Sequence, residues 1–521
     1  MPQDGLRIAF RRTHVAALAL CVVFLPWSTA FLSMAQMLLA ANWIFAGIAL
    51  GDWRMRWRGA LSAPSLAFIS FYALHALGLL WTDDLGWGLD LCRILAPVVV
   101  FGVILSGSDR LREAEFNIIL RLGAWSAIAC GVFGLLFSGA RADDYRSISM
   151  FISHIRLALL LCLAVAVLLW RMPKPAWQRI GHGLGAIAAM YLVARLGSIQ
   201  GFVILGIMAL LAAWRWTAGR TLLARWLMRA TLLATAIAPA LLIRSAWRAR
   251  VPPVVGTLEA RTAGGEAYSH DTLSTQMENG THVWTYVAWG ELDRAWNLRS
   301  KTGLYSEDAL GHPMLSTLAR YLSSKGLRKD SLGVMSLTAD DVRAIEQGVP
   351  NAERGRGSLR ARVDEVLFEL DQYRSTGQAD GHSVTMRIEF LRAGWAIAKR
   401  NSLTGVGTGD TKGAFAEHYE STSSSLAPKW RLRAHNQYLT LLISFGAGGL
   451  IVSLLAWWWP AWKHGAWRAP LFVAWAIAFG ISCLTDDTIE TQAGATFFAL
   501  YYALLVFAAP RAGFDAEASR A

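Results

Sequence analysis

The chain has 521 residues, of which 54% are hydrophobic and only 17% are charged, and it contains 24 tryptophans. A soluble enzyme of this size carries far more charge, so the composition predicts an integral membrane protein. The formal net charge of +13 would also suit a nucleic-acid-binding protein. The basic residues are concentrated in alternate short loops between apolar segments, however, which argues against that class, and we expect no nucleic-acid partner.

The apolar residues form blocks, each about the 20 residues that a helix needs to cross the hydrocarbon core of a bilayer. We therefore predict an all-α, polytopic membrane protein with about 12 transmembrane helices in contact with membrane lipid. The expected spans are residues 13–32, 34–51, 65–82, 89–107, 117–138, 149–170, 177–196, 200–217, 226–244, 436–458, 468–485 and 491–510.

Arginine and lysine gather in every second connection between these spans. Under the positive-inside rule such loops face the cytoplasm, so both termini are predicted to be cytoplasmic. The N-terminus has no signal-peptide cleavage pattern, and we expect the first span to be retained. The basic residues that set this orientation are Arg7, Arg11, Arg12, Arg54, Arg56, Arg58, Arg110, Arg112, Arg171, Lys174, Arg220, Arg225, Lys463, Arg468 and Arg511, with Arg141 and Arg146 as exceptions.

One long stretch, residues 245–434, changes to the composition of a soluble protein. The predicted topology places it outside the cytoplasmic membrane, as a large helical insert. The chain then divides into spans 1–9 at residues 1–244, the insert at 245–434, and spans 10–12 with a short cytoplasmic tail at 435–521. The sequence leaves the role of residues 245–385 open.

Helix signals recur within the insert, where apolar residues return at helical spacing between capping residues. We expect most of these helices to form a small cap. They are a helix between Pro313 and Gly326, a helix over Ala339–Gln347 with Thr338 as N-cap and Gly348 after it, an amphipathic helix over Leu359–Tyr373, and a helix over Met386–Arg400 with Ile388, Leu391, Trp395 and Ala398 at helical spacing.

A glycine-rich run, Gly405–Asp410, follows the last of these helices. It lacks the Gly-Lys-Ser/Thr of a nucleotide-binding P-loop, so we interpret it as a tight turn. The functional alternative is a set of backbone amides that line a phosphate or sugar site.

Ionisable residues at membrane depth usually mark a substrate path, because they are costly to place there. The predicted topology brings four groups of them to the outer face. These groups are Arg195 at the end of span 7, Arg387 at the head of the helix after the cap, Arg431, Arg433 and His435 before span 10, and Asp486, Asp487 and Glu490 between spans 11 and 12. His154 and Arg156, near the outer part of span 6, extend this cluster.

Each group also has a purely structural interpretation. Arg195 can be an interface anchor whose charge reaches the headgroups, and His435 can bond to the backbone at a helix start. Asp486 and Asp487 can cap the last helix, since carboxylates favour the positive end of its dipole. The functional interpretation is favoured because all these residues lie on the side where the positive-inside rule does not expect arginines.

The region from Met386 to Leu450 resembles the bacterial O-antigen ligase/polymerase superfamily. The resemblance rests on Arg-Ile-Glu-Phe-Leu-Arg-Ala-Gly-Trp from Arg387, Leu-Thr-Gly-Val-Gly-Thr-Gly-Asp from Leu403, and Ala-His-Asn-Gln-Tyr-Leu-Thr-Leu-Leu from Ala434. The Arg195-Leu196-Gly197 turn is similar to an arginine that the family carries between two mid-chain helices. The insert is longer than in a typical ligase.

The resemblance implies a GT-C-type glycosyltransferase of the bacterial inner membrane, active on the periplasmic face. Such an enzyme transfers a glycan from undecaprenyl diphosphate to an acceptor hydroxyl, on lipid A-core or on a growing glycan, with inversion and without a metal or other cofactor. His435 would be the general base. Arginine suits the departing diphosphate because its guanidinium stays charged and forms paired hydrogen bonds. The expected clamps are Arg195 and Arg387, assisted by Arg433 and Arg431, and Asp486 or Asp487 would orient His435 or hold the acceptor sugar.

Four functions remain open, and we favour the first. They are an O-antigen ligase that acts on lipid A-core, a polysaccharide polymerase that uses the same donor, a protein O-oligosaccharyltransferase, and a twelve-span transporter. The transporter is disfavoured because the two halves of the chain are unlike and the polar cluster lies at one face instead of the membrane midplane.

Overall fold

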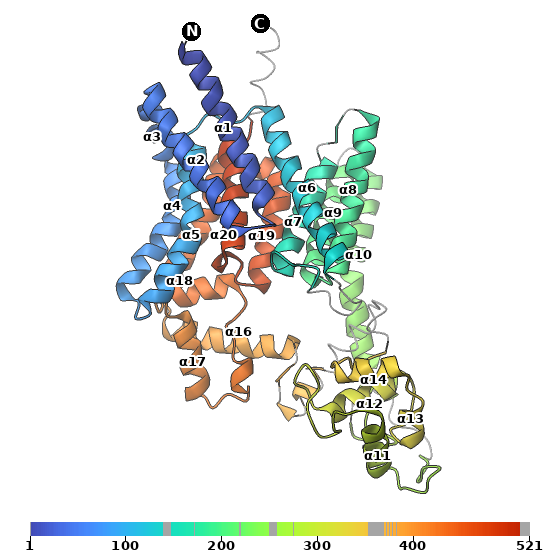
Figure 1. The fold of residues 1–521 in the computed structure, drawn as a ribbon. Helices are drawn as coiled ribbons and strands as arrows, with labels where there is room; N and C mark the ends of the chain where they lie inside the picture. The colour runs from blue at the N-terminus through green and yellow to red at the C-terminus, as the bar shows by residue number, and fades with distance from the viewer. Residues whose placement is uncertain are drawn as a thin grey trace. The chain divides into compact units, whose positions relative to one another are not determined.

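The structure is a computed structural model that describes residues 2–138, 147–170, 172–173, 175–217, 220–249, 258–274, 276–352, 369–370, 372–374, 376–377, 379–381 and 383–510. This part of the chain is mostly helical, and its one small sheet pairs β1 (Met277–Glu278) with β2 (Thr281–His282) (Figure 1). The chain forms two compact units. The first unit contains Met1–Trp216, Leu391–His418 and Arg433–Ala521, and the second contains Thr217–Phe390 and Tyr419–Leu432.

Within the described residues, a helix lies at each of the twelve expected spans. These helices are α1 (Pro2–Phe24), α2 (Thr29–Leu50), α4 (Ala63–Gly78), α5 (Leu85–Ser106), α6 (Glu113–Phe137), α7 (His154–Trp170), α8 (Ala176–Arg195), α9 (Ile199–Trp216), α10 (Leu222–Ala249), α18 (Gln437–Lys463), α19 (Pro470–Thr485) and α20 (Gln492–Ala503). A short helix, α3 (Trp53–Ala60), was not expected; it lies between α2 and α4.

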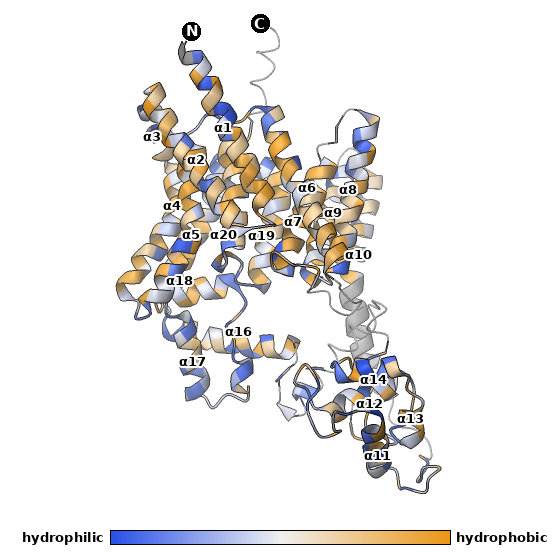
Figure 2. Cartoon of the chain, viewed as in Figure 1, coloured by the Kyte–Doolittle hydropathy of each residue, from blue (hydrophilic) through white to orange (hydrophobic). Residues whose placement is uncertain are grey.

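Six helices are long and apolar enough to cross a membrane, among the residues that were described. They are Thr29–Leu50, Ala63–Trp81, Leu85–Ser106, Glu113–Phe137, Ile199–Trp216 and Gln437–Lys463. The apolar helices α7, α19 and α20 with its extension to Ala508 are shorter. Figure 2 shows hydrophobic residues along the helices of the first unit. The chain is thus a multi-pass membrane protein by composition and helix length, and the count of about 12 spans stays a prediction.

Helix α20 runs through the core of the first unit. Every residue from Gly494 to Ala508 is buried, including the π-helical turn Leu504–Ala508 that extends the helix. Its rings pack against α4 and α19, where Phe498 lies 4.8 Å from Phe479 and Tyr502 lies 4.5 Å from Phe68 between ring centroids. A helix that is apolar on all sides belongs at the centre of a protein. The turn that precedes α20 therefore has a rigid support.

The two ends of α20 meet different parts of the first unit. At its far end, Ala508 O accepts a hydrogen bond from Leu111 N at 3.0 Å, and Ala509 O accepts one from Arg110 at 2.7 Å. Arg11 reaches the same place, since it donates to Arg110 O at 3.3 Å. The α19–α20 turn lies at the opposite end of this helix, so Arg11 and Arg110 are separated from Asp486 by its length.

The glycine run fills the space between α4 and α18. Val406 N and Gly407 N donate to the carbonyls of Ile443 and Ser444 in α18, both at 2.9 Å, and Gly409 N donates to Thr82 Oγ1 at 3.3 Å. Helix α18 leaves helical geometry at Gly446, with φ of 64°. The run is a tight turn, as predicted. Its amides already have partners in the protein, which disfavours the alternative of a phosphate-binding loop.

The second unit contains a small helical core. It is built from α11 (Trp289–Arg299), α12 (Met314–Ser324), α13 (Ser331–Met335) and α14 (Ala339–Glu346) around buried residues such as Trp296, Leu318 and Ile345. The two helices predicted after Pro313 and Thr338 are confirmed. Thr338 accepts a hydrogen bond from Asp341 N at 3.1 Å, as an N-cap does. Apart from a few residues at its C-terminal end, the helix expected over residues 359–373 lies outside the described residues.

Helix α16 (Ser383–Arg400) confirms the helix expected over Met386–Arg400, and α17 (Thr411–Ser421) follows it. Its buried positions differ from the apolar spacing seen in the sequence. Leu391 is 41% exposed and Trp395 is 53% exposed, whereas Phe390, Ala393 and Ile397 are buried. Apolar residues lie on more than one face of this helix, and only the face with Phe390, Ala393 and Ile397 packs against other elements.

Candidate functional site

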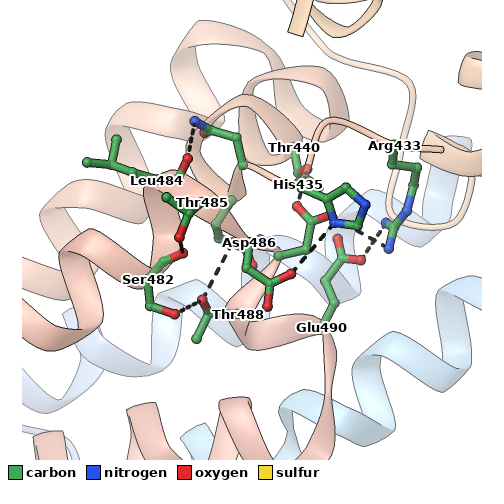
Figure 3. A network of polar contacts seen from close by, with 12 residues as sticks. Arg433, His435, Thr440, Ser482, Leu484, Thr485, Asp486, Thr488 and Glu490 are labelled. Atoms are coloured by element: carbon green, nitrogen blue, oxygen red, sulfur yellow. Dashed lines mark hydrogen bonds and ion pairs between the residues drawn. The ribbon is translucent and has the colours of Figure 1, made fainter. Parts of the chain in front are cut away.

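Three segments of the first unit meet at the start of α20. They are the first turn of α7, the residues just before α18, and the turn between α19 and α20 that contains the short 3₁₀ helix Thr488–Glu490. Figure 3 shows His435 and Arg433 from the segment before α18 beside Asp486 and Glu490 from the turn. Residues far apart in the sequence therefore form one polar cluster, which we call the carboxylate cluster: Arg156, Arg433, His435, Thr440, Asp486, Asp487 and Glu490.

The carboxylates of the turn do not cap α20. The N-cap is Thr491, whose hydroxyl accepts a hydrogen bond from Gly494 N at 3.2 Å. Asp487 precedes the 3₁₀ helix without a side-chain capping bond. The capping interpretation of Asp486 and Asp487 is therefore wrong, because a hydroxyl already satisfies the backbone at this position. Both carboxylates instead face other side chains.

Asp486 forms a buried ion pair with Arg156 of α7. Arg156 is 7% exposed and Asp486 is 8% exposed, and the guanidinium also donates to Asp487 O at 3.3 Å. A buried charge requires such a partner, because losing water is costly for both ions. Burial alone would favour the neutral carboxyl, but the contacts with His435 and the charge of Arg156 hold the pKa of Asp486 below its ordinary value. Asp486 is thus a carboxylate at neutral pH.

His435 faces the other oxygen of the same carboxylate. Its Nδ1 lies 3.7 Å from Asp486 Oδ1, and its side chain is 38% exposed. The backbone of His435 adopts φ of 48°, an uncommon conformation for a residue with a Cβ. The next residue, Asn436, ties the segment down: it caps α18 by accepting from Leu439 N at 3.0 Å and donates to Leu484 O at 3.1 Å. An imidazole is therefore held at the surface of the unit with one nitrogen toward a carboxylate.

Arg433 and Thr440 take up the remaining carboxylates. Arg433 forms an ion pair with Glu490 and lies 3.9 Å from Asp487 Oδ2. Thr440 Oγ1 donates to Asp487 Oδ1 at 2.7 Å. The cluster as described holds three carboxyl groups against two guanidiniums, with the imidazole of His435 beside them.

Three other predicted site residues, Arg195, Arg387 and Arg431, are not members of this cluster. Arg195 ends α8 in the first unit, just before a turn in which Gly197 has φ of 58°. Its Nε is buried and has no hydrogen-bond partner among the described residues. Arg387 and Arg431 belong to the second unit; Arg387 is exposed on α16, and Arg431 donates to Leu426 O at 2.9 Å. The structure thus brings Arg433, His435, Asp486 and Asp487 together.

Three members of the cluster carry weak signals or none in the sequence. One arginine in an apolar helix, such as Arg156, does not reveal its partner. Glu490 follows two other acids in a short turn, and this position does not indicate its role. Thr440 is an uncharged residue inside an apolar span, and spacing does not indicate its bond to Asp487. These contacts are evident only in the packed structure.

Residues 345–454 match the family model described as O-antigen ligase. We call this matched segment the O-antigen ligase domain. The resemblance to the O-antigen ligase/polymerase superfamily is therefore confirmed, and the domain indicates a ligase- or polymerase-type function on a polysaccharide or lipid-linked glycan. Within the cluster, the O-antigen ligase domain includes Arg433, His435 and Thr440, whereas Arg156 and the α19–α20 turn lie outside the matched residues. No curated protein matches the chain.

Proposed function

We propose that this protein is an O-antigen ligase, a metal-independent and inverting glycosyltransferase of the bacterial inner membrane. It takes a glycan from undecaprenyl diphosphate and joins it to a hydroxyl of lipid A-core on the periplasmic face. The observation that carries the proposal is the series of contacts from His435 to Asp486 to Arg156, in which the histidine belongs to the O-antigen ligase domain.

His435 acts as the general base in this proposal. With Nδ1 turned toward Asp486, Nε2 takes the proton of the acceptor hydroxyl as the hydroxyl oxygen bonds to the anomeric carbon. The bond from that carbon to the diphosphate breaks, and its electron pair leaves with the phosphate oxygen. Attack from the face opposite the diphosphate inverts the anomeric centre. Asp486, kept ionised by Arg156, stabilises the imidazolium that forms.

Arginines bind the departing diphosphate. Arg195 is the main candidate in the first unit, because its buried Nε has no hydrogen-bond partner among the described residues and such a group favours an anionic acceptor. Arg433 assists from beside His435. Arg387 and Arg431, which the sequence also predicts as diphosphate ligands, belong to the second unit, and their role stays a prediction from the sequence. Their guanidiniums stay charged while negative charge develops on the leaving group.

The proposed orientation in the membrane places both termini in the cytoplasm. One observation supports it. The basic residues Arg11 and Arg110 lie at the far end of α20 from the carboxylate cluster, and the positive-inside rule assigns such residues to the cytoplasmic side. This orientation also includes the domain boundaries proposed from the sequence, in which residues 245–434 form an extracytoplasmic insert. Single cysteines introduced at Arg12 and Arg343 test it. A thiol reagent that does not cross the cytoplasmic membrane should label the cysteine at position 343 and not the one at position 12.

The activity is tested with purified protein, a lipid-linked donor and lipid A-core. We expect transfer that persists in the presence of a chelator and that is lost in both His435→Ala and Arg195→Ala, while expression and membrane insertion stay normal. Transfer at the wild-type rate in both variants would remove the proposed site. Loss of transfer with chelator alone would remove the metal-independent mechanism and leave the site intact.

A deletion strain separates the ligase from its closest alternative. Free core together with accumulated lipid-linked polymer is the expected result for a ligase. Core that bears a single repeat unit would instead identify a polymerase. Unchanged lipopolysaccharide with a loss of glycan from proteins would point to a protein O-oligosaccharyltransferase.

A further inference from the structure

Glu490 is a buried acid to which the proposed reaction assigns no role. It ends the 3₁₀ helix between α19 and α20, and its side chain is 10% exposed. Its carboxylate meets Arg433, the arginine that lies two residues before the proposed base. An ionisable side chain is rarely buried unless it is paired, so this contact accounts for its presence.

The carboxyl of Glu490 faces the protein interior. It lines an enclosed cavity of about 10 Å³ together with His75 of α4 and with Gln437 and Thr440 of α18. That volume corresponds to roughly one water molecule and is too small for a sugar or a phosphate. A substrate therefore cannot reach Glu490 through this cavity, and the ion pair with Arg433 is the contact through which Glu490 can act on the proposed site.

Charged and titratable groups face Glu490 from several elements. Asp486 and Asp487 act on it from its own turn, and Arg433 acts on it from the segment before α18. His75 from α4 and the apolar Leu91 and Leu95 from α5 line the same cavity. Arg156 from α7 and His435 reach this group through Asp486. Burial and the charge of Asp487 outweigh the attraction of Arg433 and raise the pKa of Glu490 to about 7. Its protonation state can therefore change near neutral pH.

Arg433 has few other contacts that fix its guanidinium. Its nearest approach to another carboxylate is 3.9 Å from Asp487, beyond hydrogen-bond distance. Without the Glu490 carboxylate, the guanidinium would be free to turn toward Asp487 and Asp486, where it would compete with His435 for the carboxylate that the base requires.

We propose that Glu490 is a positioning residue whose carboxylate form holds Arg433 in place beside His435. The inference rests on the proposed function, because it gives Arg433 a role in binding the diphosphate. It follows that two deprotonated groups favour transfer: His435 as the base, and Glu490 as the anchor of Arg433. Protonation of Glu490 releases Arg433 and lowers the affinity for the lipid-linked donor.

The experiment is the pH dependence of kcat/KM for the donor in wild type and Glu490→Gln. In wild type, log kcat/KM should fall on the acidic side as the base is protonated, with an added step of about one log unit where Glu490 is protonated. In Glu490→Gln that added step should be absent, so the gap to wild type should close as the pH falls. At pH 8 the variant should show about a tenfold higher KM and little change in kcat, since one charge-assisted hydrogen bond is lost. Asp340→Asn, which removes the exposed pair with Arg343, is the matched control and should keep the wild-type profile.

Several outcomes overturn the inference. A gap between wild type and Glu490→Gln that stays the same at every pH does so while His435→Ala remains inactive, and the proposed function then stands without this addition. Full activity of His435→Ala would overturn the proposed function itself. If Glu490→Gln does not fold, Glu490→Asp replaces it: this variant should keep the added step but at another pH, and an acidic limb identical to that of wild type would reject the role of Glu490.

Discussion

The first unit carries arginine–carboxylate pairs at both ends of α20, and the two ends differ in how these pairs are balanced. At the basic end, Arg11 pairs with Glu115 and Arg56 pairs with Asp52, so each carboxylate has an arginine of its own. In the carboxylate cluster, three carboxylates share Arg156 and Arg433, and His435 shares Asp486 with Arg156. Equal pairing of acids and arginines stabilises the fold. Where carboxylates outnumber arginines, one group of the set can accept a proton, as acid–base catalysis requires.

The largest expected effect separates the two ends by activity. His435→Ala should lower glycan transfer by at least about 100-fold, because general base catalysis typically contributes that much or more. Arg11→Gln at the basic end should leave the rate within about twofold of wild type, since an exposed or partly exposed pair contributes little. The measurement is transfer by purified protein at equal amounts of folded enzyme. Comparable losses of transfer activity in both variants would contradict the proposal that only the carboxylate cluster takes part in the reaction.

The next effect concerns stability. Arg156→Met leaves Asp486 buried without its cation, which should cost roughly 3 kcal/mol of unfolding free energy. Arg11→Met removes a more exposed cation and should cost about 1 kcal/mol or less. Thermal unfolding of the two variants in the same detergent compares them directly. An equal shift for both would mean that the two ends are energetically alike. Arg156→Met combined with Asp486→Asn should recover part of the loss.

Two of the three acids of the turn, Glu490 and Asp486, should change the stability with pH in opposite directions. The pKa of Glu490 is raised to about 7, so its contribution to stability is fully present below the unfolded value and is lost as pH rises through 7. The pKa of Asp486 is lowered, so its contribution is present above the unfolded value and is lost as the solution is acidified. Relative to wild type, Glu490→Gln should gain stability from pH 5 to pH 8. The unfolding midpoint of Asp486→Asn should fall relative to that of wild type as the pH rises from about 3 to 5, around the ordinary aspartate pKa.

The smallest expected effect concerns a single hydrogen bond. Thr440→Val keeps the shape of the side chain but removes the 2.7 Å bond to Asp487, and it should cost about 1 kcal/mol of stability with a few-fold loss of transfer. Ser453→Ala in the same helix removes a buried bond to Gly449 O outside the cluster and is the control for stability alone. If the control lowers transfer as much as Thr440→Val does, the hydrogen bond to Asp487 has no effect on transfer beyond its effect on stability.

Local features of the fold were predictable from the sequence. Helices occur at the expected spans, Thr338 caps α14, and Gly405–Asp410 forms a turn, because these features depend on apolar length and on capping within a few residues. The buried face of α16 and the extra helix α11 were not predicted. Both depend on which neighbours a helix meets, and the sequence of one segment does not carry that information.

The sequence by itself determined that the chain is a helical membrane protein, and it placed His435 at the start of one helix and Asp486 and Asp487 between two others. Only the tertiary structure decided how these groups are paired. Arg156 and Asp486 are separated by 330 residues, and their contact exists because α7, α19 and α20 pack together. A buried charge must find its partner in space. Pairing is therefore a property of the packed helices, and it is the pairing that makes His435 a candidate base.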